Sequence, residues 1–326
     1  MLGHVEAWHR LVAGDLPGSA TARARVSEVD VDAELGRAER IGARVVVPGD
    51  AEWPGALDHP LVSPHLLYLR GAARIDEVAR QAVAVVGSRA SSGYGEAVAR
   101  ELGAGLAGRG WSVASGLAYG IDGAGHRGAL AVGGACLAVL PCGPDQIYPQ
   151  GHRRLADAVL EHGLVVTEQP CGRSARRHRF LSRNRLIAGL SRAVIVVEAG
   201  LRSGSLNTAG WAEELGVPVG AVPGPVTSMA SAGCHDWISR DRARLVSDTD
   251  DVVRLAAQVG DPDVLYLRLG VIGSDGEVHD VAGVVLHHVH HARAAVRPLG
   301  GGTDLHSVGG GEQQARAGCV EHALSD

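Results

Sequence analysis

Residues 82–95 read AVAVVGSRASSGYG, and this stretch decides the fold. It opens with the continuous apolar run Ala82–Val86, a pattern typical of a strand that is covered on both faces in a parallel sheet. A turn with glycine and serine follows, and an amphipathic pattern over about Gly95–Gly108 then predicts a helix. A buried strand, a short turn and a helix in this order form the first half of a βαβ unit.

The alternation of strand and helix continues along the chain. Apolar runs predict further strands at Ser112–Ser115, Ala135–Leu140, Leu164–Thr167, Ala193–Val197 and Val217–Val222. Helical patterns between them lie at Ile121–Val132, His152–His162, Ser182–Leu190 and Leu206–Leu215. The sequence therefore predicts an α/β fold with a doubly wound, mostly parallel sheet and helices on both faces, in which ligands bind at the carboxyl ends of the strands.

This domain is assigned to residues 41–258, which include two apolar runs before the first of these strands, Arg44–Val47 and Leu66–Leu69. Residues 1–40 are rich in Ala, Arg and Glu and predict a short helical N-terminal stub. Residues 259–326 keep no sustained period and contain GGG twice, which predicts an irregular, disordered tail.

The composition is that of a soluble globular protein. The 326 residues are 45% apolar and 21% charged, with no apolar run long enough to span a bilayer and no signal peptide at the start, so we expect a cytoplasmic protein. Five cysteines form no CxxC pair, which fits a reducing compartment and argues against a metal site or other cofactor. The HHVHH segment at His287–His291 leaves metal binding by the tail as an alternative to disorder.

The basic residues are all arginine, because the sequence contains 31 basic residues and no lysine. Without lysine the chain has neither a Walker-A GxxxxGK[ST] loop nor a lysine Schiff base, and P-loop ATPases are excluded. The net charge of −5 gives no overall cationic field. Affinity for nucleic acid must therefore come from a local cluster of arginines.

The turn after the first strand reads GSR at residues 87–89. Free backbone N–H groups at the start of a helix favour an anion such as phosphate, and the Arg89 guanidinium matches phosphate oxygens. The alternative is a surface arginine that neutralises a helix end. The dinucleotide fingerprint is absent, because Val98 stands where GxGxxG has its third glycine. Ser115 and Gly116 also stand where a ribose-binding acid is expected.

An acid-free segment between Glu168 and Glu198 carries a cluster of arginines, which we call the arginine belt. Its seven members are Arg173, Arg176, Arg177, Arg179, Arg183, Arg185 and Arg192. A charge run is often a solvated helix face, but such faces usually mix signs and this one does not. The belt predicts a cationic groove within an acidic protein.

Phe180, the only phenylalanine of the chain, stands inside this belt in the segment ARRHRFLSRNR. An aromatic side chain beside a cationic track is how proteins hold single strands without reading their sequence, at about 1–3 kcal/mol per stacked base. The alternative is a core phenylalanine that anchors a loop.

Asp122 and His126 lie four residues apart on one predicted helix. The pair fits acid–base chemistry. The structural alternative is that Asp122 caps the start of the helix and His126 packs or hydrogen-bonds nearby.

Five motifs resemble the DNA-processing protein A (DprA/Smf) family: GSRASSGYG, SGLAYGIDGAGHRGAL, LPCGPDQIYPQGH, FLSRNRLIAGLS and VVEAGLRSGSLNTAGWAEELGVPVGAVPG. Their order and spacing agree over about Val45–Val246. The resemblance implies a Rossmann-like fold that binds single-stranded DNA without catalysis, protects incoming DNA and loads the RecA recombinase during natural transformation. It also implies a homodimer, for which Val217–Val222 and the stretch to Trp237 are the candidate contact.

The resemblance also implies DNA-binding positions in this chain. Arg89 and Arg177 are expected to contact phosphate, Phe180 to stack on a base, and Asn184 and Arg185 of the RNR motif to shape the pocket floor. The full candidate set is Gly87, Ser88, Arg89, Ser115, Gly116, Arg177, Phe180, Asn184, Arg185, Ser203, Gly204, Ser205 and Thr208.

The chain departs from the family pattern at several places. Tyr119 replaces an arginine often found in SGLARGID, and Gly125 replaces the usual alanine before histidine. Leu181 replaces the proline that usually follows the phenylalanine, and we expect this change to loosen the loop around Phe180. The winged-helix module common in relatives is not recognisable in residues 259–326.

Two other functions remain as alternatives. One is a nucleoside-phosphate hydrolase of the phosphoribohydrolase type, whose PGGxGTxxE motif would correspond to RSGSLNTAGWAEE here, with Glu213 or Glu214 as the catalytic acid. The other is a nucleotide-sensing scaffold, which needs a pocket for a small ligand. The arginine belt has a clear role in DNA binding and none in the hydrolase, so DNA binding is favoured.

Overall fold

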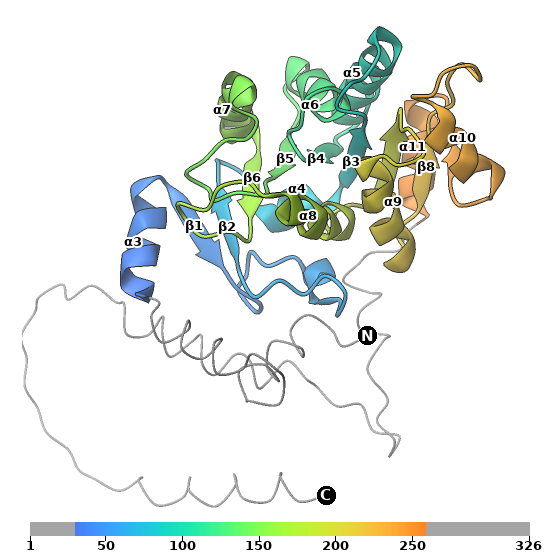
Figure 1. Ribbon diagram of the computed structural model, residues 1–326. Coiled ribbons are helices and arrows are strands. Elements are labelled where there is room, and N and C mark those ends of the chain that lie inside the picture. Colours follow the sequence, from blue (N-terminus) through green and yellow to red (C-terminus); the bar gives the residue numbers. More distant parts are fainter. Residues whose placement is uncertain (1–29, 259–326) are drawn as a thin grey trace, which may run out of the picture. The chain divides into compact units, whose positions relative to one another are not determined.

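The computed structural model describes residues 30–258, and within them a single mixed sheet forms the centre of the fold (Figure 1). Its nine strands lie in the order β1-β2-β6-β5-β4-β3-β7-β8-β9. They are β1 (Ala43–Val46), β2 (Leu67–Arg70), β3 (Ala82–Gly87), β4 (Ser112–Ser115), β5 (Cys136–Val139), β6 (Leu164–Thr167), β7 (Ala193–Val197), β8 (Val219–Ala221) and β9 (Arg244–Leu245). The expectations for residues 1–29 and for the tail, His287–His291 included, lie outside the described residues.

Helices connect these strands and cover both faces of the sheet. They are α3 (Val31–Arg40), α4 (Ile75–Arg80), α5 (Gly93–Ala107), α6 (Ile121–Ala131), α7 (Arg153–His162), α8 (Arg177–Gly189), α9 (Gly204–Glu214), α10 (Ala232–Ser239) and α11 (Thr249–Ala257), with short 3-10 helices at Gly55–Asp58 and Gln150–His152. The predicted doubly wound, mostly parallel α/β fold is confirmed.

The sheet reverses its direction of winding at β3. This strand pairs in parallel with β4 on one side, where Val83 lies opposite Val113, and with β7 on the other, where Val83 lies opposite Ala193. Connections leave such a point toward opposite sides of the sheet, so a crevice forms at the carboxyl ends of the strands. The GSR turn at residues 87–89 follows β3 and lies at this crevice.

Alternation along the strands builds two cores. Val83 and Val85 belong to the cluster that packs against α5, α6, α7 and α11. Ala84 and Val86 belong to the cluster that packs against α4, α8, α9 and α10. Both faces of the central strands are therefore apolar, which explains the continuous runs in the sequence. In Figure 1, α5, α6 and α7 lie together on one side of the sheet.

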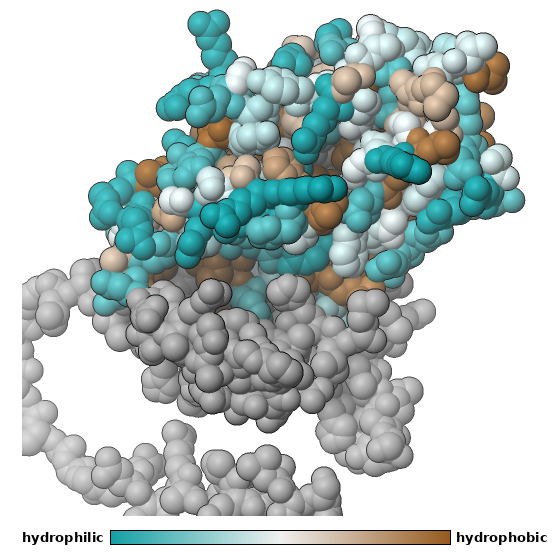
Figure 2. Space-filling model, in the orientation of Figure 1, coloured by the Kyte–Doolittle hydropathy of each residue, from teal (hydrophilic) through white to brown (hydrophobic). Residues whose placement is uncertain are grey.

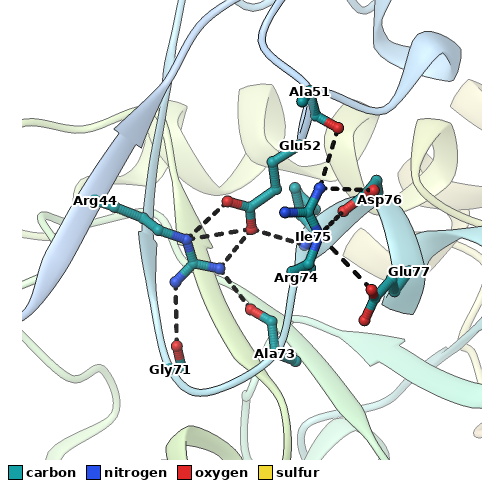
Figure 3. Close-up of polar contacts among 9 residues, drawn as sticks. All are labelled: Arg44, Ala51, Glu52, Gly71, Ala73, Arg74, Ile75, Asp76 and Glu77. Carbon is teal, nitrogen blue, oxygen red and sulfur yellow. Dashed lines mark hydrogen bonds and ion pairs between the residues drawn. The ribbon is translucent and has the colours of Figure 1, made fainter.

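The antiparallel strands β1 and β2 extend the sheet beyond β6. A polar network holds their ends (Figure 3). Arg44 donates to the Glu52 carboxylate and to the carbonyl of Gly71, and Glu52 also accepts a hydrogen bond from the backbone N–H of Ile75 at the start of α4. Arg74 binds Asp76 at 3.0 Å. One carboxylate thus joins β1 to the segment that leads into α4 and β3.

Two sequence-based expectations about the segment around Phe180 are wrong. Helix α8 begins at Arg177, five residues before the expected start, because no proline or glycine interrupts the segment and the Phe180 N–H reaches the Arg176 carbonyl. Phe180 therefore lies in the first turn of a helix and not in a loosened loop. Strand β8 lies between β7 and β9 with its side chains buried, so the exposed part of the segment expected to form the two-fold contact is the stretch that follows β8.

His126 on α6 is fully buried, and neither ring nitrogen has a hydrogen-bond partner within residues 30–258. Burial lowers the pKa of His126 to about 3, so the ring is neutral at pH 7. A neutral, packed imidazole is the structural alternative that the sequence leaves open, and it does not fit acid–base work near neutral pH.

We predict that acid destabilises the fold through His126. The unfolded chain binds a proton near pH 6.5 and the folded chain does not, so the free energy of unfolding falls as the pH drops below that value. Between pH 7 and pH 5 the loss from this group is about 2 kcal/mol. Urea unfolding at both pH values measures it, and His126→Leu should show a correspondingly smaller pH dependence. Equal pH dependence in both proteins would contradict the assignment.

Candidate nucleic-acid interface

Backbone hydrogen bonds fix the GSR turn at the end of β3. The Ser88 N–H donates to the carbonyl of Glu198 at 2.8 Å, and the Ser88 carbonyl accepts from Ile121 at 3.2 Å. Gly87 has no room for a side chain, because an added Cβ would lie 1.9 Å from the carbonyl oxygen of Val197. The turn is thus held between β7 and α6, and its side chains project from a rigid base.

Glu198, which follows β7, holds the start of α5 through hydrogen bonds to Ser92. Its buried carboxylate accepts hydrogen bonds from the Ser92 N–H at 2.8 Å and the Ser92 hydroxyl at 2.5 Å, and Ser92 caps the helix through Gly95. Glu198 itself adopts a positive φ of 55°, which is rare outside glycine. The N–H groups of Ser88 and Ser92 are both used within the chain, and the Arg89 side chain of this turn is exposed.

Ser115 and Gly116, at the end of β4, form a floor together with Arg183. The Ser115 hydroxyl donates to the carbonyl of Val85, and an added Cβ at Gly116 would lie 2.1 Å from a guanidinium nitrogen of Arg183. Arg183 is 6% exposed and donates to the carbonyl of Val139, while its Nε has no partner in the described part of the chain. Sequence reasoning named the other two residues of the RNR motif and missed Arg183.

Asp122 completes this floor and does not cap α6, contrary to the structural expectation. The N-cap is Gly120, and the Asp122 carboxylate accepts from the N–H groups of Gly116 and Ala118 at 3.1 and 3.4 Å. Burial raises the pKa of Asp122, and the Arg183 guanidinium opposes that rise. Burial lowers the pKa of Arg183 to about 10, an effect that Asp122 partly offsets. The two groups hold the β4–α6 turn against α8.

Asn184 connects α8 to the start of α9, where the candidate residues Ser203, Gly204 and Ser205 lie. Its amide donates to the carbonyl of Gly204 at 3.4 Å and to the Asn207 side chain at 3.1 Å. Ser203 caps α9, and its hydroxyl lies 2.7 Å from that of Ser205. Ser205 and Thr208 are both buried, at 8% and 2% exposure. The structure thus brings Asn184 to the start of α9, where the Ser203 hydroxyl accepts a hydrogen bond from the Ser205 N–H.

Arg185 is a structural residue in this arrangement. Its guanidinium binds the Glu168 carboxylate at 2.5 Å and donates to the carbonyls of Val62 and Ser182. The side chain is 4% exposed, so its charge is already neutralised inside the protein. The expected role of Arg185 in the pocket is therefore support of α8, and a ligand would meet other arginines.

Arg89 and Phe180, which are 91 positions apart in the sequence, come into contact. The Arg89 guanidinium carbon lies 4.7 Å from the centroid of the Phe180 ring, a cation–π arrangement. The Tyr148 ring meets Phe180 edge to face, with centroids 5.4 Å apart and planes at 69°. Phe180 is half-buried and belongs to neither of the two main core clusters. The alternative of a core phenylalanine is therefore not what the fold contains.

The arginine belt divides by burial into two groups. Arg183 and Arg185 are buried in α8, whereas Arg173, Arg176 and Arg177 are exposed at its start and in the loop before it. Burial and the nearby charges of Arg176 and Arg173 lower the pKa of Arg179, which is half-buried between the groups. Figure 2 shows hydrophilic residues across the face where α8 and the preceding loop lie. The exposed arginines Arg173, Arg176 and Arg177 give this part of the surface a positive charge, and the groove that the sequence predicts stays a prediction.

The fold and this edge define a Rossmann-like α/β protein with an arginine-rich surface at the carboxyl edge of its sheet. The sequence model of the family described as DNA recombination-mediator protein A matches residues 44–257. The chain belongs to this DprA/Smf family of DNA processing proteins. No helix within residues 30–258 is long and apolar enough to span a membrane.

Individual relatives support this assignment. A DNA processing protein DprA of Mycobacterium tuberculosis is 48% identical over 275 residues, which cover 80% of this chain and 70% of that protein. The crystal structure of DprA from Streptococcus pneumoniae matches with a TM-score of 0.68 at 36% identity, covering 76% of this chain and 85% of that one. DprA from Helicobacter pylori, whose structure is described by its single-stranded-DNA binding mode, matches with a TM-score of 0.60 at 25% identity, covering 66% and 96%.

We predict that Gly116→Ala destabilises the protein, because its Cβ would overlap the buried Arg183 guanidinium. Overpacking of this kind costs about 1–3 kcal/mol. Gly93→Ala is the matched control, since no heavy atom lies within 4 Å of its added Cβ, and alanine there should be neutral or stabilise by about 0.4–1 kcal/mol. Chemical denaturation of the two variants measures the difference, and equal effects would show that the floor adapts freely.

Proposed function

We propose that this protein is a cytoplasmic single-stranded-DNA-binding recombination mediator that works without catalysis, protects incoming DNA and loads the RecA recombinase during natural transformation. The observation that carries the DNA-binding part is the contact of Arg89 with Phe180 beside the exposed arginines at the start of α8. Family membership supports the RecA and transformation parts.

Charge and stacking have separate roles in this site. Arg89 and Arg177 neutralise phosphates of the strand, and Arg176 beside them adds to the same field. Phe180 offers an aromatic surface to an unpaired base, which duplex DNA does not present. Arg89 lies over one side of the ring, so a base either occupies the rest of the ring or displaces the guanidinium toward phosphate. Arg183 and Asp122 keep the floor beneath the strand rigid.

The hydrolase alternative loses support from the surroundings of its candidate acids. Glu213 forms an ion pair with Arg242 at 2.6 Å on the surface, and this pairing lowers the pKa of Glu213. Glu214 is exposed on the same helix. A catalytic acid or base near neutral pH needs a raised pKa and a site that shields it from water, and neither glutamate has them.

We predict that oligo-dT binds at least about tenfold more tightly than duplex DNA of equal length, the equivalent of one stacked base. Arg89→Ala and Arg177→Ala should each make the slope of log K against log salt shallower by roughly 0.7, because each removes one phosphate contact. Phe180→Ala should weaken binding by about 1–3 kcal/mol with the slope unchanged, since stacking releases no counterions. Fluorescence anisotropy across a salt series measures all three.

Arg109→Ala provides the control for this series. Arg109 follows the C-terminal end of α5, at the opposite edge of the sheet, and pairs with Asp250. Its replacement should leave both affinity and slope at their wild-type values. If the Arg89 and Arg177 variants behave like the Arg109 variant, the exposed arginines are a solvated face and the proposed site is wrong.

We also expect self-association, through the loop between β8 and α10. Val226 and Met229 there are 90% and 75% exposed, unlike the buried side chains of β8. Sedimentation velocity at micromolar concentration should show a dimer that Val226→Glu combined with Met229→Glu converts to monomer, because a buried unpaired charge opposes association. Val132→Glu, at an exposed position after α6, is the control. A wild-type monomer at these concentrations would refute the expectation.

A further inference from the structure

The exposed aromatic side chains of this protein gather at one edge of the sheet. Within residues 30–258, the exposed Tyr, Trp and Phe residues are Tyr94, Tyr119 and Tyr148, at 45%, 50% and 43%. Each follows a parallel strand: Tyr94 comes after β3, Tyr119 after β4 and Tyr148 after β5. Phe180 follows β6. Because β3 to β6 are neighbours in the sheet, the four rings lie beyond the carboxyl ends of four adjacent strands, Tyr119 and Tyr148 in loops and Tyr94 and Phe180 in the first turns of α5 and α8.

Tyr148 continues the surface that Phe180 begins. The two rings touch with centroids 5.4 Å apart, and the interplanar angle of 69° gives each ring a different facing direction. Arg89 lies over the Phe180 ring, whereas no cation–π contact involves Tyr148 within the described residues. Tyr148 therefore presents an uncovered aromatic surface directly beside the first stacking residue.

A hollow of about 580 Å³ lies beside Tyr148, between the β5–α7 and β6–α8 loops. Asp145, Gln150, Ser174 and Arg153 contribute to its lining. Asp145 accepts hydrogen bonds from Gly172 at 2.9 and 3.1 Å, which fixes its carboxylate in place. A fixed carboxylate repels phosphate but accepts hydrogen bonds from a base amino or imino group. The chemistry of the hollow thus fits the edge of a nucleobase.

Tyr119 adds a third ring, one strand further along. Its ring packs edge to face against His152 at 4.8 Å, and His152 is held by the carbonyl of Leu117 at 2.9 Å and by Arg127 at 3.0 Å. His152 ends the same loop that carries Tyr148. The contact with His152 therefore holds the half-exposed Tyr119 ring in place. Tyr119 after β4 follows a strand adjacent to the one that precedes Tyr148, and neighbouring strands in a sheet are about 4.8 Å apart.

We propose that Tyr148 and Tyr119 extend the Phe180 site into an aromatic row, on which consecutive unpaired bases of one DNA strand lie across the carboxyl ends of β6, β5 and β4. The hollow beside Tyr148 receives the edge of one of these bases. This inference rests on the proposed function, because it needs a single strand at Phe180. It gives the strand a path along the sheet edge, from α8 toward the GSR turn.

The test compares two ligands of equal length and charge: a dT 12-mer and a 12-mer deoxyribose-phosphate chain without bases. Tyr148→Ala and Tyr119→Ala should each lower the affinity for dT about 5- to 150-fold, the cost of one stacked base, and leave the affinity for the abasic chain unchanged. Tyr148→Phe and Tyr119→Phe keep the rings and should bind dT as the wild type does. Anisotropy at fixed salt measures every pair.

Leu181→Ala is the matched control, because Leu181 is 47% exposed beside Phe180 but carries no ring. It should keep the wild-type ratio of dT to abasic affinity. If both tyrosine-to-alanine variants keep that ratio while Phe180→Ala lowers it, the aromatic row is refuted and the proposed function stands. If the wild type binds the dT 12-mer and the abasic chain equally, the bases add nothing to the affinity. That result would refute both base stacking and the proposed function. Loss of affinity for both ligands would indicate a structural role for the tyrosines and would also refute the row.

Discussion

Parallel pairing of β3 with both β4 and β7 is the constraint on which the rest of this structure depends. It brings the loops of several strands to one edge, and it leaves a crevice that the GSR turn enters. Glu198 then ties the end of β7 to the start of α5 through Ser92. The Ser88 and Ser92 N–H groups are thereby used within the chain, and the positive charge of the edge comes from arginine side chains.

Those arginines serve two physical purposes. A buried guanidinium must be paired and hydrogen-bonded, because its desolvation is costly, and removing one partner of a buried pair costs about 3–5 kcal/mol. Arg185 meets that requirement through Glu168, whereas Arg183 meets it in part, with a hydrogen bond to the Val139 carbonyl and the charge of Asp122 nearby. Arg173, Arg176 and Arg177 stay in water, where their charge remains available to a polyanion. The same short segment therefore builds the helix α8 and charges the surface beside it.

The sequence predicts the sheet well because each central strand is apolar on both faces, and the observed bounds of β4, β6 and β7 agree with the expected ones. It predicts less of the site. The expected start of α8 at Ser182 is five residues too late, because the amphipathic pattern begins only there, whereas the polar segment from Arg177 contains no proline or glycine and continues the helix. Glu198 and Arg183 were missed because their roles depend on long-range burial, and Glu198 lies 106 positions from Ser92. The RNR motif was the one local signal for Arg183.

Besides arginines, the carboxyl edge of the sheet carries aromatic residues. The chain has only five tyrosines and one phenylalanine, and four of these six follow β3, β4, β5 and β6. Tyr68 is buried in β2, so the core uses aromatic side chains sparingly and is built mainly from Val, Leu, Ile and Ala. Each of the four rings follows a different strand, in a loop or in the first turn of a helix, so no local sequence motif identifies them as a group. Topology alone makes them neighbours, and it does so beside the exposed arginines, where stacking and charge neutralisation act on the same strand.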